Sequence, residues 1–221
     1  GSIGSELPRQ ILRYRPAKMI LFDQAETPLY DLELELKDKY HFYDYATIVG
    51  DVSDEQKMQY VFETFRPTIV YHAAAYKHVP LMENNPDEAI RTNISGTRIT
   101  AEMAHQYEAG QFVLISTDKA VNPRSIMGAS KRVAEIYIRE KNETSATLFV
   151  TTRFGNVLGS NGSVIPRFRQ QIAAGGPVTV THPEITRYFM TLSEACQLVL
   201  EAGSMARGGE IYLFDMGESM K

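Results

Sequence analysis

The 221-residue chain has the composition of a folded globular protein, because 43% of its residues are hydrophobic and 23% are charged; this excludes a disordered or fibrous chain. Its formal net charge of -4, with no basic cluster, argues against a nucleic-acid partner. No apolar run approaches the roughly 20 residues of a membrane helix and no signal peptide is visible, while the single cysteine, Cys196, excludes an intrachain disulfide and is typical of a reducing cytoplasm.

Apolar strands and amphipathic helices alternate along residues 1–155, which is the pattern of βαβ units around a parallel sheet. In the helix expected at 54–65, Ser53 can serve as the cap, and Met58, Val61, Phe62 and Phe65 recur on one face. The expected strands lie at 18–23, 46–50, 68–72, 111–116 and 146–154, and the expected helices at 5–15, 28–39, 54–65, 86–107 and 126–140.

After about residue 155 the order loosens into connections rich in Gly, Ser, Asn and Pro. We expect a helix at 163–174, a strand at 178–181, a helix at 193–203 and a strand at 210–216 there. The predicted fold class is α/β, a doubly wound parallel sheet at 1–155 followed by a small, C-terminally incomplete lobe at 156–221. Since proline costs about 3 kcal/mol deep inside a helix, Pro8 predicts that the first helix begins at or after Gly4.

Two short stretches carry the strongest chemical signal. The apolar strand at 112–115 ends in Ser116-Thr117-Asp118-Lys119, and Met127-Gly128-Ala129-Ser130-Lys131 follows eight residues later. Because the carboxyl ends of parallel strands face the ligand crevice of an open α/β sheet, a hydroxyl, an acid and an amine at such an end indicate chemistry.

The second stretch has the spacing of the Tyr-x-x-x-Lys pair of the extended short-chain dehydrogenase/reductase family, with Lys131 in place and Met127 where the tyrosine would be. A thioether carries no proton, so Met127 cannot be the acid or base. With STDKA and Pro123 before it, the chain resembles the UDP-N-acetylglucosamine 4,6-dehydratases of the CapD-like polysaccharide-biosynthesis branch of that family. The resemblance covers nearly the whole chain and implies a Rossmann-like NAD-binding domain at 1–155 and a nucleotide-sugar lobe at 156–221.

The resemblance implies NAD as the cofactor. Part of a dinucleotide fingerprint is matched by Gly1, Ser2, Ile3 and Gly4, with the first glycine and its strand absent, so we expect unpaired neighbouring strands and weak NAD binding by these residues alone. Asp23 would bind the ribose hydroxyls and repel the 2′-phosphate of NADP. The other implied cofactor contacts are Asp51, Val52, Ala73, Ala74, Asn93 and Lys131.

The resemblance also implies a UDP-sugar substrate and no metal. Its implied substrate contacts are Lys77, His78, Asn156, Ser163, Val164 and Arg187, and its implied catalytic residues are Thr117, Asp118, Lys119 and Lys131. In the implied reaction NAD oxidises C4 of the sugar, which acidifies the C5 proton, and water then leaves across C5 and C6 before the hydride returns to C6. Asp118 would be the acid, Lys119 the base, and Thr117 a hydrogen-bond partner of the C4 oxygen, while the acceptor of the C4 hydroxyl proton stays open among Asp118, Lys119 and water.

Several alternatives remain open at this point. A nucleotide-sugar 4-epimerase, another nucleotide-sugar dehydratase, a non-catalytic NAD sensor and a structural protein with an inherited nucleotide site would share the fold. Individual residues also have ordinary roles, since Asp23 can form a turn or a helix cap, His72 can pack, and Arg187 can form a surface ion pair. Family members commonly dimerise through the helices that correspond to 86–107 and 126–140, which implies a homo-oligomer, and many carry upstream membrane helices, which would place the parent protein at the cytoplasmic face of the inner membrane.

Overall fold

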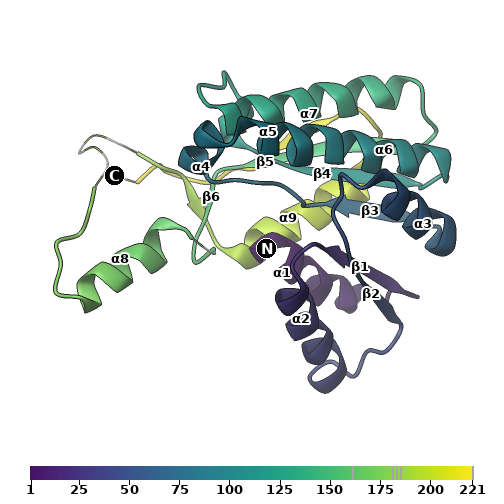
Figure 1. The fold of residues 1–221 in the computed structure, drawn as a ribbon, viewed down its shortest axis with the longest axis horizontal. Coiled ribbons are helices and arrows are strands. Elements are labelled where there is room, and N and C mark those ends of the chain that lie inside the picture. The colour runs from purple at the N-terminus through teal and green to yellow at the C-terminus, as the bar shows by residue number, and fades with distance from the viewer. Residues whose placement is uncertain (161, 181, 183, 185, 221) are drawn as a thin grey trace.

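The named strands pair in parallel, as expected, but they form three sheets. The computed structural model describes residues 1–160, 162–180, 182, 184 and 186–220 (Figure 1). One sheet pairs β1 (Met19–Asp23) with β2 (Tyr45–Val49), and a second has the order β3 (Ile69–His72), β4 (Gln111–Thr117), β5 (Leu148–Phe154), β8 (Ile211–Leu213). The third pairs the two-residue strands β6 (Asn156–Val157) and β7 (Phe189–Met190). The predicted α/β class with parallel pairing is confirmed.

Helices cover both faces of the four-stranded sheet. On one face Phe112 and Leu114 of β4 pack with α3 (Glu55–Phe65), α6 (Thr97–Gln106) and α7 (Ile126–Glu143). On the other face the intervening Val113 packs with α1 (Ser2–Ile11) and α9 (Leu192–Met205). This alternation follows from the two-residue period of a strand. Each fully buried Phe or Leu contributes roughly 1.5–3 kcal/mol, so this apolar strand anchors both layers.

The two-stranded sheet has its own small core. Met19 and Leu21 of β1 pack against Leu29, Leu32 and Leu36 of α2 (Glu26–Asp38). Within the described ranges, β1 and β3 are end strands of their sheets, each with one edge that no strand pairs. The fingerprint strand was expected between these two edges.

The first helix differs from the prediction at both ends. It begins at Ser2, before Gly4, and contains Pro8. The prediction was wrong because it weighed the missing Pro8 N–H and left out tertiary packing: Leu7, Pro8 and Gln10 are buried, and Gln10 Nε2 donates to the Ser193 carbonyl of α9 at 3.0 Å. After Ile11 the chain tightens into the 3₁₀ turn η1 (Leu12–Tyr14).

Two other expectations changed. The cap of α3 is Asp54, whose Oδ1 accepts from the Lys57 N–H at 3.0 Å, because the Ser53 hydroxyl donates to Asp51. The helix expected at 86–107 is a succession of α5 (Pro86–Ala89), a π-helix η2 (Ile90–Gly96) and α6, preceded by α4 (Val79–Asn84). The wide turn of η2 places Asn93 against the loop after β3.

The elements after residue 155 lie in two places, some against the main sheet and one apart from it. Helix α9 packs on α1, and β8 pairs with β5, so both belong with the main sheet. Helix α8 (Val164–Ala173) lies apart from the main sheet at the lower left of Figure 1. Of the strand expected at 178–181, residues 178–180 form none, because Thr179 bonds the Gln171 side chain instead of a neighbouring strand; residue 181 lies outside the described residues. No helix of the described chain is long and apolar enough to cross a membrane.

Candidate functional site

The carboxyl end of β4 carries a hydrogen-bonded group of polar side chains. Thr117 ends the strand, and Asp118 and Lys119 begin the 3₁₀ turn η3 (Asp118–Ala120). Asp118 Oδ1 accepts from Thr117 Oγ1 at 2.9 Å and from Lys119 Nζ at 3.0 Å, and Lys119 Nζ also donates to Asn156 Oδ1 at 3.3 Å. The Asp118 side chain is 44% exposed and that of Lys119 35% exposed, so both can reach a ligand. We call Thr117, Asp118, Lys119 and Asn156 the β4-end group.

A close backbone contact holds this group against α7. A Cβ atom placed on Gly128 would lie 2.3 Å from the Lys119 carbonyl oxygen and 3.2 Å from its carbonyl carbon. The shorter of these separations is sterically forbidden, and the atoms met are backbone, which cannot rotate away. Gly128 is therefore required for the first turn of α7 to lie directly on the Lys119 main chain.

Lys131 lies one turn further along α7 in a different environment. Its side chain is 4% exposed, and within the described chain its ammonium makes no hydrogen bond. Burial lowers the pKa of Lys131 to about 8, although the nearby Glu135 carboxylate acts in the opposite direction. A buried ammonium without a partner is suited to a ligand hydroxyl or a developing negative charge.

Met127 occupies a sealed position. It is 3% exposed and packs with Met82 of α4 and Ala89 of α5. Its thioether thus belongs to the small core between these helices and α7, consistent with the prediction that it carries no proton.

The fingerprint residues and Asp23 come together at the amino end of α1. The Gly1 nitrogen lies 3.6 Å from Asp23 Oδ2, and a Cβ on Gly4 would stand 3.9 Å from the Cβ of Ala73. Ser2 and Ile3 lie in the same first turn, where Ile3 packs on the α9 side of the sheet. The small side chains of Ala73 and Ala74 follow β3, so the carboxyl ends of β1 and β3 and the start of α1 meet at one place.

Three implied cofactor residues use their side chains within the protein. Asp51 accepts hydrogen bonds from the Ser53 N–H and hydroxyl, and Arg91 lies 3.2 Å away. Burial is the largest single influence on the pKa of Asp51 and raises it, but these contacts together lower the pKa below its usual value. Val52 packs so closely on Gly96 that a Cβ there would lie 2.6 Å from its methyl group. Asn93 is fully buried, bonded to the Tyr76 main chain and to Ser130.

His72 is enclosed at the end of β3. Its Nε2 lies 3.0 Å from Thr97 Oγ1 and its ring packs on Phe112. Burial, helped by the charge of Lys131, lowers the pKa of His72 to about 3, so the ring is neutral at physiological pH. This fits the packing role that the sequence left open.

The implied substrate residues lie on two facing segments. In the loop after β3, the His78 ring lies against Gly162, where a Cβ would be 2.7 Å from its Cε1, and desolvation lowers the pKa of Lys77. Ser163, the N-cap of α8, has a buried hydroxyl without a partner in the described chain, and Val164 begins the helix. Arg187 pairs its main chain with Met220 and donates from Nη1 to the Thr186 carbonyl.

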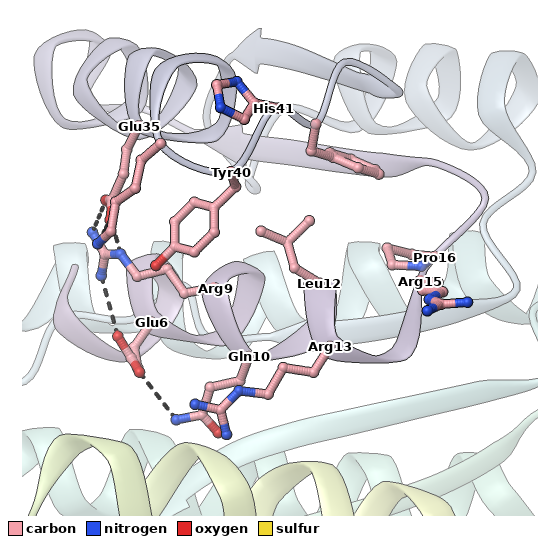
Figure 2. Close-up of a pocket in the computed structure, with 12 residues that line it drawn as sticks. Glu6, Arg9, Gln10, Leu12, Arg13, Arg15, Pro16, Glu35, Tyr40 and His41 are labelled. Carbon is pink, nitrogen blue, oxygen red and sulfur yellow. Dashed lines mark hydrogen bonds and ion pairs between the residues drawn. The ribbon is translucent and has the colours of Figure 1, made fainter.

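A cavity of about 680 Å³ lies elsewhere, between α1, η1 and the end of α2 (Figure 2). Arg9 there donates to Glu35 at 2.7 Å and to Glu6 at 3.3 Å, and Glu35 also bonds Lys39 at 3.0 Å. Arg9 thus joins α1 to α2, while the lining as a whole carries more cationic than anionic side chains, with Arg9, Arg13, Arg15 and Lys39 beside Glu6 and Glu35. None of the residues implied in catalysis lines it.

The sequence reasoning missed the buried network beneath the β4-end group, formed by Ser116, Glu135 and Arg153. One signal was available, since Glu135 stands four residues after Lys131 and such residues share a helix face. Among the described residues no group of three or more His, Cys, Asp or Glu side chains could hold a metal ion.

Comparisons with known proteins show which family the chain belongs to. The family described as "Polysaccharide biosynthesis protein" matches residues 1–221. The chain is 54% identical over 223 residues to the capsular polysaccharide biosynthesis protein CapD of Staphylococcus aureus, matching 100% of this chain but 37% of that protein. It is 32% identical to a UDP-N-acetylglucosamine 4,6-dehydratase (inverting) of Campylobacter jejuni strain 81-176 (96% of this chain, 64% of that protein) and 36% identical to a UDP-glucose 4-epimerase of Rickettsia canadensis (87% and 56%).

Solved structures share the fold. Pen from Bacillus thuringiensis superposes with a TM-score of 0.91 at 35% identity over 98% of this chain and 68% of that one. DesIV, a dTDP-glucose 4,6-dehydratase of Streptomyces venezuelae solved with NAD, has a TM-score of 0.87 at 22% identity over 100% and 74%. This chain therefore has a Rossmann-type fold and belongs to the polysaccharide biosynthesis protein family.

Proposed function

We propose that this chain carries the active site of an NAD-dependent 4,6-dehydratase that converts UDP-N-acetylglucosamine to the 4-keto-6-deoxy sugar for surface polysaccharide synthesis. The observation that supports this best is the Asp118–Lys119 pair at the end of β4, which places an acid and an amine 3.0 Å apart. Because the chain spans 37% of the S. aureus relative, the activity of the whole protein is part of the proposal.

The described residues fit NAD. The amino end of α1 would receive the pyrophosphate, Asp23 the adenosine ribose, and the unpartnered Lys131 ammonium the nicotinamide ribose. The solved neighbour DesIV holds NAD in the same fold. When bound, NAD would supply a hydride acceptor for C4 of the sugar and a donor for C6.

Asp118 and Lys119 can divide acid and base catalysis between them. With Lys119 as the neutral amine, the Asp118 carboxylate takes the proton that the C4 hydroxyl releases on oxidation, by way of Thr117, and becomes a carboxylic acid. Lys119 then removes the C5 proton, while Asp118 protonates the departing C6 hydroxyl, which leaves as water. Lys119 returns its proton to C5 once C6 has been reduced, so both groups end as they began and protons and electrons balance.

We assign the C4 oxygen to Thr117. Its hydroxyl donates to Asp118 at 2.9 Å, which gives a route for the C4 hydroxyl proton toward that carboxylate. Among the acceptors that the sequence left open, we therefore favour Asp118. The buried position of Met127 supports an active site that works without the family's tyrosine.

The direct test is incubation of purified protein with UDP-N-acetylglucosamine and NAD, followed by mass spectrometry and NMR of the sugar. We expect a product lighter by one water, and Asp118→Asn should suppress it. A C4 epimer of unchanged mass would instead support the epimerase function suggested by the Rickettsia relative. An unchanged sugar in the presence of bound NAD would leave a binding protein as the better description.

A further inference from the structure

A fully buried carboxylate lies directly beneath the proposed active site. Glu135 is 1% exposed and receives hydrogen bonds from three residues. Its Oε1 accepts from Ser116 Oγ at 2.6 Å and from Arg153 Nε at 2.7 Å, and its Oε2 accepts from Arg153 Nη2 and from Arg132 Nη1, the latter at 3.1 Å. Because a buried carboxylate is costly unless fully satisfied, this network locks three elements together.

The three elements are α7, which carries Lys131, and β4 and β5, whose carboxyl ends lead into the β4-end group. Ser116 and Arg153 are register partners on β4 and β5, so both side chains lie on the same face of the sheet. Ser116 immediately precedes Thr117, and Arg153 lies three residues before Asn156. Glu135 is one helical turn beyond Lys131.

We propose that Glu135 is a positioning residue that, through its bonds to Ser116 of β4 and Arg153 of β5, fixes the turn of α7 that carries Lys131 relative to Thr117, Asp118 and Lys119. This rests on the proposed function for its kinetic readout. Glu135 touches no reacting atom itself, so it acts through the residues it holds.

The surrounding charges single out this carboxylate. Within the described chain, Glu135 is the charged group that raises the pKa of Lys131 against the effect of burial, and His72 of β3 is the group that feels the charge of Lys131 in return. The remaining charged or titratable groups on elements packed against α7 are Glu83 of α4, Asp87 and Glu88 of α5, Arg91 of η2, Arg98, Glu102 and His105 of α6, Asp118 and Lys119 of η3 and Arg153 of β5.

The test follows the titration of Lys131 by NMR of its side-chain methylene groups, with the signal assigned through Lys131→Met, beside the pH profile of kcat/KM. In Glu135→Gln we expect the Lys131 midpoint to fall by at least about half a pH unit. We expect kcat to fall roughly 10- to 100-fold, because misplacement of about 1 Å has effects of that size, while KM changes less than about threefold.

Three further variants separate charge from packing. Glu135→Met combined with Arg153→Met replaces the buried pair by apolar groups and should restore folding but leave the lowered Lys131 midpoint. Glu135→Asp, which keeps the negative charge, should recover most of the wild-type Lys131 midpoint. Glu102→Gln breaks a different ion pair, between Glu102 of α6 and Lys141 of α7, and should leave the Lys131 midpoint unchanged.

Clear outcomes would overturn the proposal. A wild-type midpoint and kcat in the double methionine variant would show that the pair only packs, as would identical effects of Glu135→Gln and Glu102→Gln. If wild-type protein does not dehydrate the sugar, the proposed function fails, but the Lys131 midpoint still decides the positioning role independently.

Discussion

Two lysines twelve residues apart occupy opposite environments in the same site. Lys119 is on a 3₁₀ turn, 35% exposed, with its ammonium held by Asp118 and Asn156. Lys131 is inside α7, 4% exposed, and its ammonium bonds no described residue. The same functional group is thus arranged for proton exchange with its neighbour in one place and for a fixed positive field in the other, so the environment and not the residue type divides their proposed roles.

Removing the first amine should give the largest effect. Lys119→Met should lower turnover by at least the roughly 100-fold typical of a lost general base, with NAD and UDP-sugar affinity retained. Exchange of the C5 proton with deuterated solvent should also stop. Lys141→Met, which removes an ion-paired lysine at the far end of α7, is the matched control; equal turnover in both variants would remove Lys119 from the mechanism.

Disturbing the contact between Gly128 of α7 and the Lys119 main chain should have the next largest effect. Gly128→Ala drives a methyl group into the Lys119 main chain, so we expect a loss of roughly 1–3 kcal/mol in unfolding free energy and a 10- to 100-fold fall in kcat. Denaturant titration and steady-state kinetics measure both. Ala129→Ser, on the exposed side of the same turn, should change neither by comparison; a fully active Gly128→Ala protein would contradict the tight packing described.

The pH dependence should report the buried lysine. Because the folded pKa of Lys131 lies near 8, below its unfolded value of 10.5, its positive charge is present below about pH 8 and lost above. We expect kcat/KM to decline above about pH 8. The sign for stability is opposite, since the unfolded chain binds more protons between pH 8 and 10.5, so this lysine's contribution to stability rises with pH across that window. Lys131→Met should remove this lysine's part of the stability slope, measured by denaturant titration of both proteins at several pH values.

Restoring the absent tyrosine should change activity least. Met127→Tyr must fit a larger ring and a hydroxyl between α4, α5 and α7, so it should cost about 1–3 kcal/mol of stability and leave dehydration near or below the wild-type rate. Thermal unfolding and turnover test this together. A large gain in turnover would contradict the assignment of proton transfer to Asp118 and Lys119.

Local sequence signals predicted much of the fold and part of the site. The strand expected at 111–116 was recognisable because residues 112–115 are continuously apolar, and the place of Thr117, Asp118 and Lys119 followed from the end of that strand. The start of the first helix could not be predicted, because burial of Leu7 and Pro8 outweighs the local cost of proline. The spacing of Glu135 from Lys131 indicates a shared helix face, but the partners of Glu135 could not be predicted, since they depend on the register that places Ser116 beside Arg153.

Helix α1 has a further consequence for cohesion. It packs against α9 under the four-stranded sheet, while Arg9 ties it to Glu35 on the helix that covers the two-stranded sheet. The two-stranded sheet has a small core of its own, but Ile20, Phe22 and Ile48 on its other face also pack against the main core, so opening either sheet must break this apolar contact as well as the Arg9 pair. A dinucleotide that spans Asp23 of β1 and Lys131 of α7 would fasten the two sheets together, and local opening of either sheet would then require its release.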